Sequence, residues 1–165
     1  MAISKDKKRV ISAKLSTALK EATAAVFVGF NKLGVAETSA MRGELKRSGV
    51  HYFVAKKTLL RRALAEQGFS GEVPSLPGEV ALAWTTEEDT TMPARGVYGF
   101  GRKLKGALSL LGGIFEGSYA DAERINAIAT IPPMPILRGM FVNVVNSPIQ
   151  GLVTALDKIR EQKAA

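Results

Sequence analysis

Apolar residues recur at two different spacings in the first 130 residues of the chain. A spacing of four residues, as at Ile11, Leu15 and Leu19, is typical of a helix that buries one face. Short apolar runs such as AVFVGF, bounded by polar or glycine-rich segments, are typical of strands. The first pattern predicts helices over residues 4–22, 38–48, 57–67, 91–104 and 122–128. The second pattern predicts strands over residues 25–30, 50–54, 79–85 and 107–115.

The alternation of these helices and strands predicts an α/β (α+β) fold. We expect a mixed sheet of about four strands packed with helices. Gly49 and Gly68 follow two of the predicted helices, at the position where glycine commonly ends a helix. The glycines of LLGGIFEG predict a strand that another backbone approaches closely. Trp84 is expected in the core.

A different pattern begins after residue 130. The segment IPPMP, residues 131–135, has three prolines in five positions, which predicts a stiff hinge. Beyond it, an apolar stripe predicts a long amphipathic helix over residues 136–165, interrupted near Pro148. Two segments of this helix, 137–146 and 149–158, repeat each other weakly. The expected organisation is therefore a domain over 1–130, a hinge and a C-terminal helix.

Positive charge is concentrated at the start of the chain. The net charge is +8 over 165 residues, but residues 1–62 carry +10 and residues 63–131 carry −4. This distribution favours contact with a polyanion, such as nucleic acid or a membrane surface. Solvated helix faces are the alternative that composition leaves open.

The cations of the basic segment form three groups: Lys56, Lys57, Arg61 and Arg62; Arg42, Lys46 and Arg47; and Lys5, Lys7, Lys8 and Arg9. One group surrounds the start of the helix predicted at 57–67, where cations are unfavourable unless an anion binds the helix N-terminus. No row of exposed aromatic residues is apparent, so the pattern favours recognition of folded RNA through its backbone over stacking on single strands. The candidate RNA-binding residues are Lys5, Lys7, Lys8, Arg42, Lys46, Lys56, Lys57, Thr58, Arg61 and Arg62.

The apolar stripe of the C-terminal helix is a candidate partner-binding surface, because an exposed stripe of this length is typical of an interaction site. Folding of the helix back onto the core is the alternative. Binding to a membrane ranks last, because the helix has only four cations. The candidate partner-binding residues are Leu137, Met140, Phe141, Val144, Val145, Ile149, Leu152, Val153, Leu156 and Ile159.

Residues suited to catalysis are scarce. The chain has no cysteine, which fits a cytoplasmic protein and excludes thiolate chemistry, and it has one histidine, His51. The acidic cluster Glu87–Asp89 precedes a predicted helix, where it is more commonly structural than catalytic or metal-binding. The glycine-rich runs lack the spacing of nucleotide-binding loops. We therefore expect no enzyme activity, no metal, no cofactor and no small-molecule substrate.

Three motifs, FVAKKTLLRRAL, LGVAETSAMRGELKRSGV and LLGGIFEG, are similar in sequence and order to motifs of a known family. Together with the hinge and the terminal helix, they make the chain resemble the bacterial large-subunit ribosomal protein ten family, at the base of the ribosomal stalk. The resemblance covers almost the whole chain. It places Lys56, Lys57 and Thr58 on the family's RNA-contacting motif and Arg42 on the neighbouring helix. Lys57 stands where the family usually has Asn.

The resemblance implies an N-terminal domain that binds large-subunit ribosomal RNA beside ribosomal protein eleven. It also implies that the terminal helix holds dimers of the small acidic stalk protein, which recruit translational GTPases. The two weakly repeated segments favour two dimers. A ribosome-assembly factor that shares the N-terminal domain is the main alternative, but such a factor should lack the terminal stripe.

Overall fold

The computed structural model describes residues 5–31, 33–71, 73–87, 89–104 and 107–164, with the side chains of residues 5–7 and 164 left out. The chain divides into two compact units, Met1–Ile131 and Pro132–Ala165. The first unit contains the sheet and its covering helices, and the second consists of one long helix.

The first unit is built on an antiparallel sheet with the strand order β2-β3-β1-β4-β5. Its strands are β1 (Ala24–Phe30), β2 (Val50–Val54), β3 (Glu79–Thr85), β4 (Leu108–Phe115) and β5 (Ser118–Asp121). Both β1 and β2 pair antiparallel with β3, so they run in the same direction with β3 between them. This is a split β-α-β arrangement, and it leaves β2 at one edge of the sheet.

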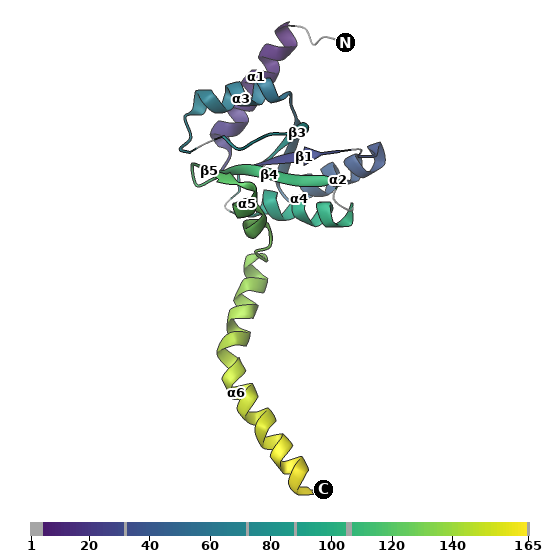
Figure 1. The fold of residues 1–165 in the computed structure, drawn as a ribbon, viewed down its shortest axis with the longest axis vertical. Coiled ribbons are helices and arrows are strands. Elements are labelled where there is room, and N and C mark those ends of the chain that lie inside the picture. Colours follow the sequence, from purple (N-terminus) through teal and green to yellow (C-terminus); the bar gives the residue numbers. More distant parts are fainter. Residues whose placement is uncertain (1–4, 32, 72, 88, 105–106, 165) are drawn as a thin grey trace. The chain divides into compact units, whose positions relative to one another are not determined.

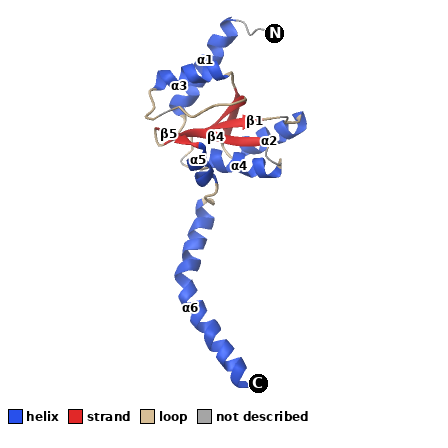
Figure 2. Cartoon of the chain, viewed as in Figure 1, coloured by secondary structure: helices blue, strands red, loops and turns tan. Residues whose placement is uncertain are grey.

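Helices cover both faces of the sheet, as Figures 1 and 2 show. The helices of this unit are α1 (Lys5–Glu21), α2 (Val35–Arg47), α3 (Lys57–Gln67), α4 (Met92–Lys103) and α5 (Ala122–Ala129). The central strand β1 alternates between two cores: Val26 and Val28 pack towards α2, α4 and α5, while Ala25 and Phe27 pack towards α1 and α3. The result is a three-layer unit with α1 and α3 on one face of the sheet.

The α+β class is confirmed, but the sheet differs from the expected mixed sheet of about four strands. A fifth strand forms because Glu116 and Gly117 adopt positive φ angles of 52° and 76° and close a tight hairpin between β4 and β5. The sheet is antiparallel because β3 inserts between the two parallel strands β1 and β2. Helix α2 begins three residues before the predicted start, since the Glu37 carboxylate accepts a hydrogen bond from the Gly34 N–H at 3.2 Å.

The predicted close approach at LLGGIFEG is confirmed. A Cβ atom at Gly113 would lie 2.5 Å from the Ala25 carbonyl oxygen on β1. Gly112 has a φ of 143°, and a Cβ there would lie 2.8 Å from the Pro74 ring. The register of β1 against β4 shifts at this point. Glycine is therefore required where β4 packs against both its neighbouring strand and the loop before β3.

The second unit is α6 (Met134–Ala164), which begins inside the segment 131–135 expected to be a hinge. Proline fits the first turn of a helix because its missing N–H has no intrahelical partner there. The helix also continues through Pro148, which was expected to interrupt it. Within the described residues, no single helix is long and apolar enough to cross a membrane, and by length and composition alone one pair, α5 with α6, meets that test.

Candidate nucleic-acid interface

The start of α3 is an open helix N-terminus at the end of edge strand β2. Lys56 is the N-cap residue, with an extended backbone and no side-chain cap hydrogen bond, and the first turn contains no acidic residue. The backbone N–H groups of Leu59 and Leu60 donate to the Lys56 carbonyl at 3.0 and 3.1 Å. The N–H groups of Lys57 and Thr58 precede these bonds and have no acceptor within the helix. This geometry suits an anion.

The cations around this helix start are exposed because α3 turns its apolar face, including Leu60 and Leu64, towards the sheet. In the part of the chain that the structure describes, the single salt bridge joins Arg95 to Asp89. The α3 cations therefore have no carboxylate partner there. The exposed residues of this group are Lys56, Lys57, Thr58, Arg61 and Arg62. We call them the α3 group.

A hollow of about 540 Å³ adjoins the α3 group. Its lining includes Lys56, Lys57 and Thr58 together with Phe30 at the end of β1 and Gly78 before β3. The α3 group therefore lies beside a concave surface where the ends of three strands meet, which gives an approaching polyanion more than a flat face to contact.

The second predicted group lies on the opposite face of the sheet. Helix α2 buries Met41 and Leu45 and leaves Arg42 and Lys46 exposed. The Arg42 guanidinium carbon lies 5.6 Å from the centre of the Tyr52 ring on β2. Burial raises the pKa of the Tyr52 hydroxyl, although the charge of Arg42 acts in the other direction. The α2 and α3 cations thus flank the same edge strand from its two faces.

The third predicted group belongs to α1, which packs beside α3 on the same face of the sheet. Lys8 is exposed there. The side chains of Lys5 and Lys7 lie outside the described residues. The structure therefore brings α1 and α3 together and places the α2 cations across β2 from both.

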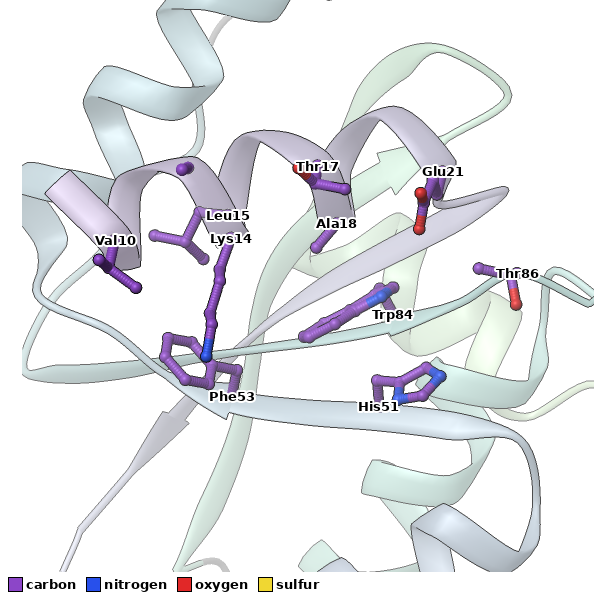
Figure 3. Close-up of a pocket in the computed structure, with 11 residues that line it drawn as sticks. Val10, Lys14, Leu15, Thr17, Ala18, Glu21, His51, Phe53, Trp84 and Thr86 are labelled. Carbon is purple, nitrogen blue, oxygen red and sulfur yellow. The ribbon is translucent and has the colours of Figure 1, made fainter.

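An aromatic group that the sequence pattern did not predict lies beneath α1. His51 on β2 and Trp84 on β3 are directly opposite each other in the strand register, and their rings stack at 5.4 Å with an interplanar angle of 24°. Figure 3 shows both rings beneath α1, with Phe53 and Lys14. These side chains line a cavity of about 610 Å³. Trp84 is half-buried rather than a fully buried core residue, because it lines this cavity. Periodicity could not have paired residues that are 33 positions apart.

The acidic segment before α4 is a structural element. One Asp89 carboxylate oxygen accepts hydrogen bonds from the Thr91 N–H at 3.1 Å and the Thr91 hydroxyl at 2.6 Å, and the other accepts one from Arg95 at 3.0 Å. Partial burial works to raise the pKa of Asp89, but these hydrogen bonds outweigh it and hold the pKa below its usual value. Glu88 lies outside the described residues. Within those residues, no cluster of His, Asp or Glu could hold a metal ion.

The chain matches a known family over most of this unit. The family model for ribosomal protein L10 matches residues 3–100. The chain belongs to the ribosomal protein L10 family. It is 34% identical to the large ribosomal subunit protein uL10 of Staphylococcus saprophyticus over 145 residues, which cover 88% of this chain and 85% of that protein. It is 32% identical to the uL10 protein of Shouchella clausii over 158 residues, which cover 96% and 94% of the two chains.

Membership of the L10 family makes this chain a structural constituent of the large ribosomal subunit, located at the ribosome in the cytoplasm. The family is structural rather than enzymatic. The family-model match ends in α4 and contains all three cation groups. The alignment with the Shouchella protein leaves out about seven residues of the chain, so it also spans most of α6.

The predicted partner-binding residues of this L10 protein all lie on α6 with exposed side chains. Leu137 has the smallest exposed fraction, 41%, and Phe141 and Val144 have the largest, 71%. A single helix has no other element in its own unit to bury these side chains. The apolar area is therefore available to whatever α6 packs against.

Proposed function

We propose that this L10-family protein binds large-subunit ribosomal RNA through residues 1–130 and holds dimers of the small acidic stalk protein on residues 136–165. The observation that carries the RNA half of the proposal is the open N-terminus of α3, with its exposed cations and no acidic residue in the first turn. RNA phosphates would supply the charge that this site lacks.

The cations lie on two faces of the sheet, so their positions favour an RNA duplex or folded RNA loop that contacts both faces. The α3 group and the α2 residues Arg42 and Lys46 lie on different faces of the sheet and share β2 between them. An RNA that contacts both must wrap around this edge of the sheet. Lys57 in place of the family's usual Asn keeps a hydrogen-bond donor and adds a charge, which strengthens phosphate attraction at that position.

We also propose that ribosomal protein eleven is a neighbour of this chain in the same assembly.

The stalk half of the proposal rests on α6. Its apolar side chains need a partner, and its four cations against two carboxylates suit an acidic one. The weakly repeated segments 137–146 and 149–158 lie on either side of Pro148, which supports two binding segments and hence two dimers. An assembly factor would not need this helix, so α6 favours the stalk-base role over that alternative.

Native mass spectrometry of the tagged chain, purified from its own cells, tests the stalk half. We expect the full-length chain to carry four copies of one small acidic protein, and a chain cut after residue 131 to carry none. The truncated chain should still bind large-subunit ribosomal RNA. If the full-length chain carries no acidic partner, α6 packs elsewhere and the stalk assignment is wrong.

A further inference from the structure

The cavity beneath α1 is separate from the α3 group. It lies between α1 and the β2–β3 end of the sheet, and its volume of about 610 Å³ is within the range of small-molecule sites. Its floor consists of the stacked His51 and Trp84 rings, with Phe53 beside them, and its wall is the α1 stripe from Val10 to Glu21. His51 is exposed, so the stack can be reached from solvent on its His51 side.

We propose that this cavity, which we call the base pocket, takes one unstacked nucleobase of the RNA bound by the N-terminal unit. The inference rests on the proposed RNA-binding function and adds a base contact to it. A planar aromatic ligand is favoured because the floor of the pocket is two nearly parallel rings, and proteins commonly bind unpaired bases by stacking them on such rings.

The charges at the rim orient the nucleotide. Lys14 extends from α1 towards Phe53 at one end of the pocket, while Glu21 lies at the other end (Figure 3). The two residues are seven positions apart on α1, about 10 Å along the helix axis. The phosphate of a bound nucleotide would lie at the Lys14 end, and the hydrogen-bond donors of its base would face Glu21. An apolar peptide would gain nothing from this polarity.

The base pocket, although separate from the phosphate site, lies close to it along the chain. Phe53 and Lys56 are three residues apart at the end of β2, so their α-carbons are at most about 11 Å apart. One RNA segment can therefore place a base beneath α1 and a neighbouring phosphate at the start of α3. The short segment from Phe53 to Lys56 would therefore contact both the stacked base and the bound phosphate.

Trp84 is the only tryptophan of the chain, so its fluorescence reports on the base pocket alone. The full-length protein would be titrated with an eight-nucleotide adenosine RNA and with an abasic oligomer of the same length and charge. We expect the RNA to quench Trp84 and the abasic oligomer to bind without quenching it. His51→Ala should weaken binding of the RNA about tenfold and leave binding of the abasic oligomer unchanged, because one stacked base is lost. His51→Phe, which keeps a ring, should restore the affinity.

Two further results separate this inference from the proposed function. The double variant Lys56→Ala with Arg61→Ala should weaken binding of both oligomers. It should leave the quenching of Trp84 by saturating RNA unchanged. If adenosine RNA fails to quench Trp84 while large-subunit ribosomal RNA still binds the protein, the base pocket is wrong and the phosphate assignment stands. If ribosomal RNA does not bind either, both are wrong.

Discussion

The salt dependence of RNA binding should change when two cations of the α3 group are removed. The substitutions are Lys56→Ala and Arg61→Ala, at the N-cap and one turn into the helix. Both side chains are exposed and neither belongs to the core, so the fold should survive. Each lost phosphate contact lowers the slope of log K against log salt concentration by about 0.9 on a duplex and about 0.7 on a single strand.

Two lost contacts should therefore lower the slope by about 1.4 to 1.8. Between 50 and 200 mM salt, a slope difference of this size corresponds to roughly a tenfold difference in how much affinity is lost. The wild-type protein should thus lose about ten times more affinity over this range than the double variant. Filter binding of large-subunit ribosomal RNA at four or five salt concentrations measures both slopes.

The matched control removes the same charge elsewhere. Arg102 on α4 and Arg124 on α5 are exposed, lie on helices that pack beside β4, and belong to none of the three cation groups. The variant Arg102→Ala with Arg124→Ala should keep the wild-type slope. An unchanged slope in the Lys56 and Arg61 variant would refute phosphate binding at α3. An equal fall in the control would show that only net charge matters.

Other substitutions test α6, the hydrogen bonds of Asp89 and the packing around glycine. Phe141→Asp should release one stalk dimer in native mass spectrometry and leave RNA binding intact; loss of RNA binding would place α6 in the core. The hydrogen bonds to Asp89 lower its pKa, so they stabilise the fold when its carboxylate is ionised. Because the group is partly exposed to solvent, their contribution is at most about 1 kcal/mol. It should be present at pH 7 and be lost as the pH falls from the ordinary pKa of 3.8 through the lower pKa of the folded state. Urea unfolding of the wild type and Asp89→Asn should differ at pH 7 and converge near pH 2. Gly113→Ala should lower the free energy of unfolding by about 1–3 kcal/mol, because the new Cβ meets the Ala25 carbonyl oxygen. Gly43→Ala, in open space on α2, should raise it by up to about 1 kcal/mol. Equal effects of the two substitutions in urea unfolding would refute the steric argument.

Elements with a strong local pattern could be predicted from the sequence. The bounds of β2, β3 and α3 are those expected, because each has a clear apolar pattern and a turn or glycine at its end. Strand β5 was missed because SYAD has one buried residue and no period. The pairing in the sheet could not be derived from period alone, since the insertion of β3 between β1 and β2 is a property of the whole fold.

The candidate site, too, could be predicted from the sequence only in part. The exposed cations of α3 and α2 follow from helical periodicity, which identifies the faces that point away from the core. The separation of these cations by the sheet, and the meeting of His51 with Trp84, depend on strand order and register. Local sequence carries no information on either, so the base pocket could be recognised only in three dimensions.

The position of β2 at the edge of the sheet has a consequence for the protein before it joins the ribosome. An edge strand has unpaired backbone groups that can pair with the edge of a second copy and begin aggregation. Strand β2 is five residues long and is flanked in sequence by Arg47 before it and Lys56 and Lys57 after it. Like charges at both ends oppose the approach of a second β2 strand. The cations that we propose bind RNA would therefore also oppose self-association of the newly made chain.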